Sequence, residues 1–367
     1  MTAAPPRHTA PGSPPGGDGP VYLYDSDDDR PRRKRRGLAV LGLFATLVMV
    51  ALLGAGAYLF SLARAYDGNV RHFPESADGT DTVRPPEEDR PAPLDDGSMN
   101  ILLLGSDAEG GSGEDEDLPR VPGGSRSDTM MLIHLPADRE SIQVISIPRD
   151  LWVELPYDYG WHKVNAGLAL GGGEGPWLTW ATVEQMFDVR IDHIAAVDML
   201  GFTGLVDAMD GVTVNSTYSE PFTTGEGYTF QPGQQHMNSD EALSFVRHRS
   251  SFPDGDLQRI RNQQSFIRGV ISEAASPSTL SNPVRLHEMV STFSEHLITD
   301  EELDSTTAAS IAFSYRNAAD NIQFATLPTA GSGYSDDGQW IWHQDPQAME
   351  EISQAIKDGT LDEYLSR

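Results

Sequence analysis

The hydrophobic and polar positions divide the chain into segments that differ in their pattern of apolar, polar and charged residues. Residues 37–60 (GLAVLGLFATLVMVALLGAGAYLF) form one apolar run without a charged residue. From about residue 99 onward, short apolar runs alternate with segments of helical period, which is typical of an α/β domain. The pattern predicts a disordered tail over 1–36, a membrane helix over 37–60, a Pro- and acid-rich tether over 61–98 and one domain over 99–367.

The apolar run is long enough to cross a membrane, since about 20 helical residues span the hydrocarbon core. The basic cluster Arg32–Arg36 directly precedes it. The positive-inside rule therefore predicts a cytoplasmic N-terminus and an extracytoplasmic domain. Ala55-Gly56-Ala57 is compatible with a cleaved signal peptide, but the run is longer than a signal sequence needs and follows a long polar tail. These features favour an uncleaved single-pass anchor.

Within the domain, the hydrophobic period predicts alternating strands and helices. The expected strands cover 100–104 (with a turn at Gly105), 129–135, 143–147, 191–198 and 322–326. The expected helices cover 164–170, 178–187, 202–209, 256–273 and 347–356. Asn238 or Ser239 is expected to cap a further helix that runs towards Val246.

Composition and charge exclude several classes of function. The chain has 26 Lys and Arg against 55 Asp and Glu, a formal net charge of −29, which argues against nucleic-acid binding. The acidic excess lies after residue 36, because residues 1–36 hold seven basic and five acidic residues. The absence of Cys excludes disulfides, thiolate zinc sites and cysteine nucleophiles. The sequence also lacks the P-loop, HExxH and GxSxG motifs.

Charged residues follow three of the expected strands. Asp107 comes after NILLLGS, Arg126 and Asp128 lie in RSDTMMLIHL, and Arg149 and Asp150 lie in ISIPRDLW. Ligands of α/β folds bind at strand ends and in the loops beyond them. One such residue is most often a solvated turn, but charged groups at three strand ends indicate a site.

A second group of charged residues lies between 246 and 264. If Val246–Arg249 is extended, Arg247 and Arg249 point to one face. On the following helix Asp256, Arg259 and Gln263 are spaced i, i+3, i+7 and form one stripe. Taken alone, this stripe is best explained as a surface ion pair.

Together the two groups predict a phosphate site. Arg binds phosphate in a bidentate manner and stays charged, and five arginines are candidates. They are Arg126, Arg149, Arg247, Arg249 and Arg259. The carboxylates of Asp107 and Asp128 are suited to Mg²⁺, which prefers carboxylate and phosphate oxygens. The chemistry indicated is phosphoryl transfer or pyrophosphate binding, close to the membrane.

These motifs resemble the LytR-CpsA-Psr (LCP) family of cell-wall polymer ligases. The resemblance covers about residues 98–330 and is strongest up to Gln264. The matching stretches are NILLLGSD, RSDTMMLIHL, ISIPRDLWVELP, KVNAGLALGG, TVEQMF, IDHIAAVDMLGFTGLVDAMDGV, EALSFVRHR and DLQRIRNQQ.

The resemblance implies an α/β/α sandwich with a central mixed sheet, preceded by one transmembrane helix. Family members bind a polyprenyl-(pyro)phosphate lipid in an apolar tunnel with an arginine-lined mouth. They transfer the lipid-linked glycan to peptidoglycan through a phosphodiester bond and release polyprenyl phosphate. The apolar segments 164–170, 178–187 and 202–209 are expected to line the tunnel, although ordinary core packing explains them as well.

The resemblance also implies residue roles. By position, Asp107 and Asp128 correspond to the aspartates associated with Mg²⁺, and Asp107 is also a candidate base. The expected catalytic set is completed by Arg149 of the PRD motif, Arg247 and Arg249 of the RxR pair, and Asp256 and Arg259 of the D-x-x-R-x-x-x-Q motif. Expected substrate-binding residues are Arg126, Lys163, Asn165 and Gln263.

The sequence departs from the family pattern at two positions. Glu109 stands where many members have Arg, and Asn262 stands where others have Arg, with Arg261 beside it as a possible compensation. Two other functions stay open, a membrane-anchored lipid-phosphate-binding regulator without turnover and a pyrophosphatase. The composition suggests an actinobacterium, which favours arabinogalactan or a teichoic-acid-like polymer as the glycan.

Overall fold

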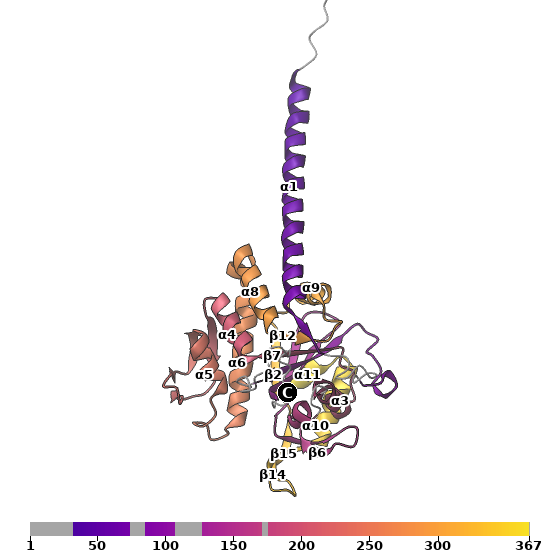
Figure 1. Cartoon of the computed structure of the whole chain (residues 1–367), viewed down its shortest axis with the longest axis vertical. Coiled ribbons are helices and arrows are strands. Elements are labelled where there is room, and N and C mark those ends of the chain that lie inside the picture. Colours follow the sequence, from indigo (N-terminus) through magenta and orange to yellow (C-terminus); the bar gives the residue numbers. More distant parts are fainter. Residues whose placement is uncertain (1–31, 74–84, 107–126, 171–174, 367) are drawn as a thin grey trace, which may run out of the picture. The chain divides into compact units, whose positions relative to one another are not determined.

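The computed structural model describes residues 32–73, 85–106, 127–170 and 175–366. The chain divides into two compact units, Met1–Ala57 and Tyr58–Arg367. Helix α1 (Arg32–Asn69) starts in the first unit and ends in the second (Figure 1). Its segment Val48–Asn69 is long and apolar enough to cross a membrane. The basic cluster at residues 32–36 forms the first turns of this helix, while residues 1–31 of the expected tail lie outside the described residues.

A seven-stranded mixed sheet forms the centre of the second unit. Its strands in spatial order are β1 (Arg71–His72), β12 (Leu297–Thr299), β7 (His193–Asp198), β2 (Met99–Ser106), β3 (Ser127–Leu135), β4 (Ile142–Ser146) and β13 (Ile322–Thr326). Strands β2, β4, β7 and β13 run in one direction, and β1, β3 and β12 run in the other. Four carboxyl ends therefore meet at one edge of the sheet.

Helices cover both faces of this sheet. Alternate residues of each strand point to opposite faces, so Leu102 and Leu104 of β2 enter one core layer and Leu103 the other. The first layer holds α2 (Ala166–Leu170), α3 (Gly175–Phe187), α10 (Pro346–Lys357) and α11 (Leu361–Leu365). The second holds α6 (Asp256–Ala274), α8 (Pro283–Glu295) and α9 (Ser305–Ser314) (Figure 1). The predicted α/β/α sandwich is confirmed.

A smaller aromatic core lies beside the sandwich. It joins α4 (Met199–Ala208) and α5 (Ser239–Arg247) to two short antiparallel pairs. The pairs are β8 (Val212–Ser216) with β11 (Gly233–Met237), and β9 (Phe222–Thr223) with β10 (Thr229–Phe230). Helix α6 packs closely on β8, since a Cβ at Gly269 would lie 2.5 Å from the Thr213 carbonyl oxygen. The predicted cap is confirmed at Asn238, which forms a capping box with Glu241.

A four-stranded sheet not predicted from sequence lies next to the carboxyl edge of the main sheet. Its order is β14 (Thr329–Tyr334), β15 (Trp340–Gln344), β5 (Leu151–Leu155), β6 (Gly160–Lys163). Strand β5 starts two residues after Arg149, and β6 ends on Lys163. This sheet thereby brings the PRD and KVNA motifs side by side.

Most predicted elements occur at their expected places, with shifted ends. The strand 322–326 has the predicted bounds, and the helix expected over 164–170 begins at Ala166. The turn expected at Gly105 is wrong, because β2 continues to Ser106. The apolar residues of α3, such as Trp180 and Phe187, are fully buried in the core layer.

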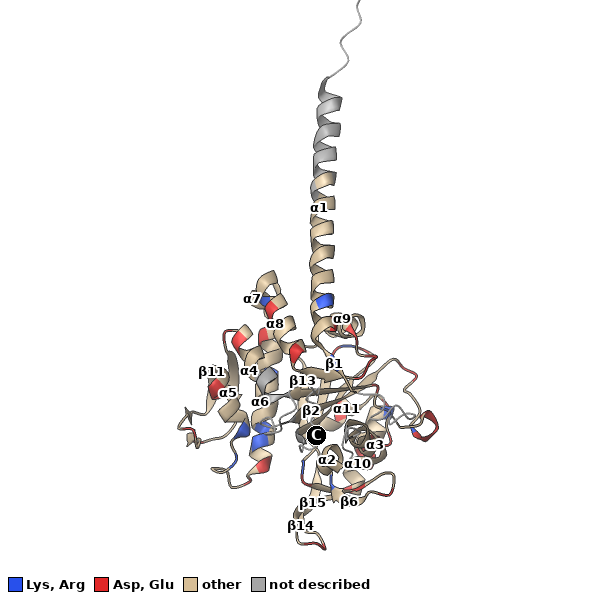
Figure 2. Cartoon of the chain, in the orientation of Figure 1, with Lys and Arg blue, Asp and Glu red and all other residues tan. Residues whose placement is uncertain are grey.

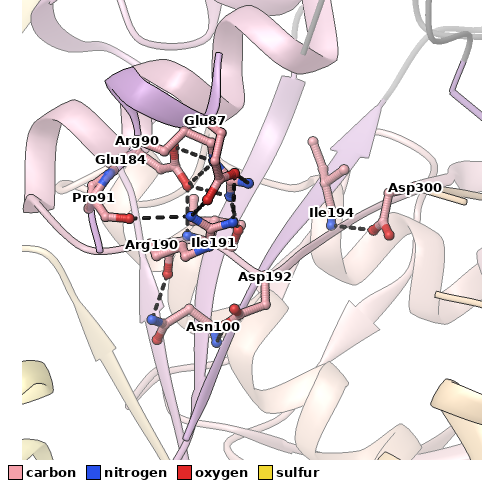
Figure 3. Close-up of polar contacts among 10 residues, drawn as sticks. All are labelled: Glu87, Arg90, Pro91, Asn100, Glu184, Arg190, Ile191, Asp192, Ile194 and Asp300. Carbon is pink, nitrogen blue, oxygen red and sulfur yellow. Dashed lines mark hydrogen bonds and ion pairs between the residues drawn. The ribbon is translucent and has the colours of Figure 1, made fainter. Parts of the chain in front are cut away.

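The segment expected as a tether contributes to the domain at both of its described ends. Val70 and Phe73 are buried, and the 3-10 helix η1 (Glu87–Asp89) leads into the buried Arg90. Arg90 Nη2 lies 2.8 Å from Glu184 Oε1 of α3 and also donates to the carbonyl of Ile191 (Figure 3). An apolar period does not reveal the part at residues 87–90, since that part is fixed by polar contacts.

Candidate functional site

The backbone register places Asp128 and Ser106, the residue before Asp107, at the same edge of the sheet. Ser106 pairs with Ser127 and Gly105 pairs with Thr129, so Asp128 is the extra residue of a β-bulge in β3. A Cβ at Gly105 would lie 2.9 Å from the Thr129 Cβ, and glycine therefore permits this close pairing. Asp107 follows Ser106 directly but lies outside the described residues, as does Arg126. The bulge redirects the backbone at Asp128 next to the end of β2.

The PRD motif lies at the same edge, just beyond β4. Asp150 bridges two cations, with Lys163 Nζ 2.7 Å from its Oδ1 and Arg149 Nε 3.6 Å from its Oδ2. The backbone N–H of Asn165 donates to the Arg149 carbonyl at 3.2 Å. Asp150 therefore holds the lysine of β6 beside Arg149.

The first turn of α6 reaches the same arginine. Asp256 Oδ1 lies 2.6 Å from Arg259 Nη2 and 3.6 Å from Arg149 Nε. The side chains of Asp256 and Arg259 are largely buried, at 10% and 7% exposure. The predicted stripe on α6 is thus a buried pair joined to the PRD motif, and the surface ion-pair explanation does not apply.

The RxR pair lies at the end of α5. Arg247 is the last residue of the helix and His248 is its C-cap, so this segment is not the extended strand assumed for the sequence argument. Arg249 is exposed, whereas His248 is buried and stacks on Phe222 at a ring distance of 5.4 Å. Burial lowers the pKa of His248, which favours its neutral form beside Arg247 and Arg249. Lys and Arg residues gather where α5 ends and α6 begins (Figure 2).

Two amides of α6 fix this geometry. The fully buried Asn262 donates to the carbonyl of Phe245 at 3.2 Å and accepts from Gln258 at 3.0 Å, which ties α6 to the last turn of α5. Gln264 donates to Ser146 Oγ at 2.9 Å and to the Ala325 carbonyl at 3.1 Å, at the ends of β4 and β13. Asn262 therefore has a structural role of its own. Arg261 points to Asp254 at 2.6 Å on the surface, which does not support a compensating role in the site.

Two further predicted residues line the cluster. Asn165 is buried, and its Oδ1 has no hydrogen-bond partner among the described residues. Gln263 is buried on α6, one turn after Arg259. The Asn165 side chain thus keeps an unused acceptor atom, and its backbone N–H donates to the Arg149 carbonyl.

The structure joins part of the predicted site by direct contacts. Arg149, Lys163, Asp256 and Arg259 belong to one connected network through Asp150, a residue missing from the predicted set. The signal for Asp150 is its place in the PRD motif, but its role needs the β5–β6 pairing. The Asn262 contact with the Phe245 carbonyl ties α6 to the last turn of α5, the helix that ends at Arg247.

The described part of the site is suited to an anion. Its two carboxylates, Asp150 and Asp256, are each paired with cations. Across the described ranges, no three His, Asp or Glu side chains lie close enough to hold a metal ion. The carboxylates predicted to bind Mg²⁺ are those of Asp107 and Asp128, whose side chains are not among those described.

A cluster of partly buried arginines and a lysine therefore lies at the carboxyl edge of an α/β/α sandwich. A model of the LytR_cpsA_psr family matches residues 72–358. The chain therefore belongs to the LytR_cpsA_psr family, as the motifs predicted.

Relatives from two bacterial genera match to a similar degree. The cell wall biosynthesis protein LcpA of Corynebacterium glutamicum is 32% identical over 73% of this chain, which spans 59% of LcpA. A polyisoprenyl-teichoic acid–peptidoglycan teichoic acid transferase, TagU of Oceanobacillus iheyensis, is 31% identical over 84% of this chain and 90% of its own length.

Solved structures share the fold. Protein gbs0355 from Streptococcus agalactiae superposes with a TM-score of 0.61 at 23% identity, covering 72% of this chain and 88% of that protein. At this identity the superposition supports the α/β/α architecture described above.

Proposed function

We propose that this protein is a phosphotransferase that attaches a polyprenyl-pyrophosphate-linked glycan to peptidoglycan. The main support for this proposal is the network in which Asp256 lies between Arg149 and Arg259. This network lies at the sheet edge that also holds Asp128. The same activity class is named for TagU, a relative matched over 90% of its length. The proposed glycan is an arabinogalactan or teichoic-acid-like polymer, and the teichoic acid named for TagU supports the second of these.

The arginines and Lys163 bind the pyrophosphate and stabilise the negative charge that develops during transfer. A hydroxyl of peptidoglycan attacks the phosphorus next to the sugar, and the bond from that phosphorus to the bridging oxygen breaks. Polyprenyl phosphate leaves with the bond's electron pair, and the glycan phosphate becomes a phosphodiester. Asp256 orients Arg149 and Arg259, and Asp150 orients Lys163.

We further propose that Asp107 and Asp128 hold Mg²⁺. The bulge at Asp128 supports this assignment, because it lies beside Ser106, the last described residue before Asp107. A bound Mg²⁺ would supply charge neutralisation at the pyrophosphate oxygens. Calorimetric titration with Mg²⁺, compared between the protein and Asp128→Asn, tests the site independently of activity.

The proposed location is the cell membrane, with one anchor and an extracytoplasmic catalytic domain. Helix α1 supports the anchor, and Arg32–Arg36 at its start support a cytoplasmic N-terminus. Peptidoglycan and a lipid-linked glycan are both available on that side.

Product analysis separates the transferase from the two other functions. The protein is incubated with Mg²⁺, a polyprenyl-pyrophosphate oligosaccharide and peptidoglycan fragments, and products are identified by mass spectrometry. A transferase gives a phosphodiester conjugate. A pyrophosphatase gives free phosphorylated oligosaccharide, and a regulator leaves the bound lipid intact, so either of these results contradicts the proposal.

A further inference from the structure

The corner between α7 (Pro277–Leu280) and α8 exposes apolar side chains next to α1. Leu280 and Val284 are 58% and 72% exposed. The hydroxyl of Tyr58 in α1 donates to the carbonyl of Pro283 at 3.0 Å, and both residues belong to the second unit. The corner therefore lies level with Tyr58 on α1.

Tyr58 lies two residues before the end of the apolar run 37–60 of α1. The run continues through the exposed Leu59 and Phe60, while Arg64 is the first charged residue after Arg36. A few residues further, Asn69 bonds to Ser291 and Asp67 to Ser305, so the helix has entered the domain there. The bilayer boundary consequently falls near Tyr58, at a position where aromatic residues are favoured.

The corner is uncharged although the chain is strongly acidic. No Asp, Glu, Lys or Arg occurs between Glu273 and Arg285. The acidic excess of the chain lies after residue 36 and is repelled by anionic lipid headgroups, so an uncharged apolar corner approaches them at least cost.

The backbone of the corner is also satisfied internally, which a lipid environment requires. The N–H groups of residues 279–282 donate to carbonyls within the corner. Asn282 Oδ1 accepts from the N–H groups of Val284 and Arg285, and Pro277 and Pro283 have no N–H. The exposed end of the corner thus offers apolar side chains without unpaired backbone donors at these positions.

We propose that the α7–α8 corner inserts Leu280 and Val284 into the bilayer interface as a second membrane contact. This inference rests on the proposed membrane anchor. With two attachment points, the domain no longer rotates freely about the axis of α1, and one face of the domain stays towards the membrane that holds its lipid substrate.

The absence of native Cys allows a direct test by single-cysteine labelling. The full chain is placed in vesicles with a polarity-sensitive fluorophore at Leu280→Cys or Val284→Cys. Val50→Cys in α1 reports the anchor, and Tyr334→Cys on β14, 73% exposed, is the matched control. We expect brominated acyl chains to quench the labels at 280 and 284 but not the label at 334.

The outcomes separate the two proposals. Quenching at 50 without quenching at 280 and 284 overturns the corner contact and leaves the anchor. Absence of quenching at 50 overturns the anchor and, with it, the proposal of a second contact. Protection of the label at 280 from aqueous iodide without quenching by brominated lipid indicates a protein partner and also overturns the proposal.

A second variant checks that the two apolar side chains make the contact. A label at Ser281→Cys is expected to lose its quenching when Leu280→Asp and Val284→Asp are introduced together. Both positions are exposed, so the domain is expected to keep its thermal unfolding temperature. Unchanged quenching in this variant contradicts an apolar contact.

Discussion

The carboxylate of Asp256 lies 2.6 Å from the guanidinium of Arg259, and this pair is buried at the start of α6. The same oxygen of Asp256 is 3.6 Å from Arg149, which follows β4 in the main sheet. One acidic residue thus aligns two arginines from distant parts of the chain. A phosphate site built in this way depends on a carboxylate that does not itself need to touch the substrate.

Asp256→Asn is expected to reduce transfer strongly. The neutral amide no longer aligns Arg149 and Arg259, and loss of one aligned charge contact typically costs on the order of 10²-fold in kcat. The measurement is the steady-state rate of conjugate formation. Asp254→Asn is the matched control, since Asp254 pairs with Arg261 at the surface. Equal rates for the two variants would show that alignment of the arginines by Asp256 does not contribute to transfer.

Lys163→Met is expected to weaken pyrophosphate binding. A hydrogen bond to a charged group contributes about 1.5–3 kcal/mol, which corresponds to about a tenfold to hundredfold rise in Kd. Isothermal titration with geranyl pyrophosphate measures the change. Lys357→Met is the control, because Lys357 pairs with Asp188 outside the site. Unchanged affinity in Lys163→Met would show that β6 does not contribute to the phosphate site.

The buried pair of Arg90 and Glu184 is expected to stabilise the domain. Their side chains are 1% and 4% exposed, and removing one partner of a buried pair costs about 3–5 kcal/mol. Glu184→Gln is therefore expected to lower the free energy of unfolding far more than Glu87→Gln. Glu87 pairs with Arg190 but is 72% exposed, and such pairs contribute about 0–1 kcal/mol. If urea unfolding shows similar losses of unfolding free energy for Glu184→Gln and Glu87→Gln, the assignment of residues 85–98 to the folded domain is contradicted.

Stability is expected to fall in acid because of His134. Burial lowers the pKa of His134 from 6.5 to about 4, and its Nδ1 lies 2.8 Å from Asn100 Oδ1. Between these pH values the unfolded chain binds a proton at His134 that the folded chain does not bind. The contribution of neutral His134 to the free energy of unfolding is therefore present above pH 6.5 and is lost as the pH falls towards 4. The loss amounts to about 3 kcal/mol.

The pH dependence of urea unfolding measures this contribution. His134→Gln is expected to flatten the curve between pH 6.5 and pH 4. His343→Gln, at an exposed position of β15, is expected to leave the slope unchanged. An unaltered slope in His134→Gln would show that other groups cause the acid sensitivity.

The sequence predicted the elements with a strong hydrophobic period. The strand at 322–326 and the cap at Asn238 follow from local patterns, and both are confirmed. Strands β11 (GQQHM) and β14 (TAGSGY) contain almost no apolar period. Their pairing partners define them, so a single sequence does not reveal them.

The candidate site also divides into residues that local motifs predicted and residues that only the tertiary structure reveals. Motif positions predicted Arg149, Asp256 and Arg259, and the structure joins them. Asp150 was noted at a strand end but given no role, because its contact is with Lys163, thirteen residues away on a paired strand. The link from Arg90 to Glu184 spans 94 residues, and no local pattern predicts it.

The central claim is that the cationic network transfers a glycan phosphate to peptidoglycan. A single-turnover reaction of the membrane-reconstituted protein with a polyprenyl-pyrophosphate oligosaccharide and peptidoglycan fragments tests it most directly. Mass spectrometry counts both products in the same sample. We expect one polyprenyl monophosphate for each phosphodiester conjugate. We expect Asp256→Asn to lose both products together. Polyprenyl monophosphate released with free phosphorylated oligosaccharide, or an intact lipid after full binding, would contradict it.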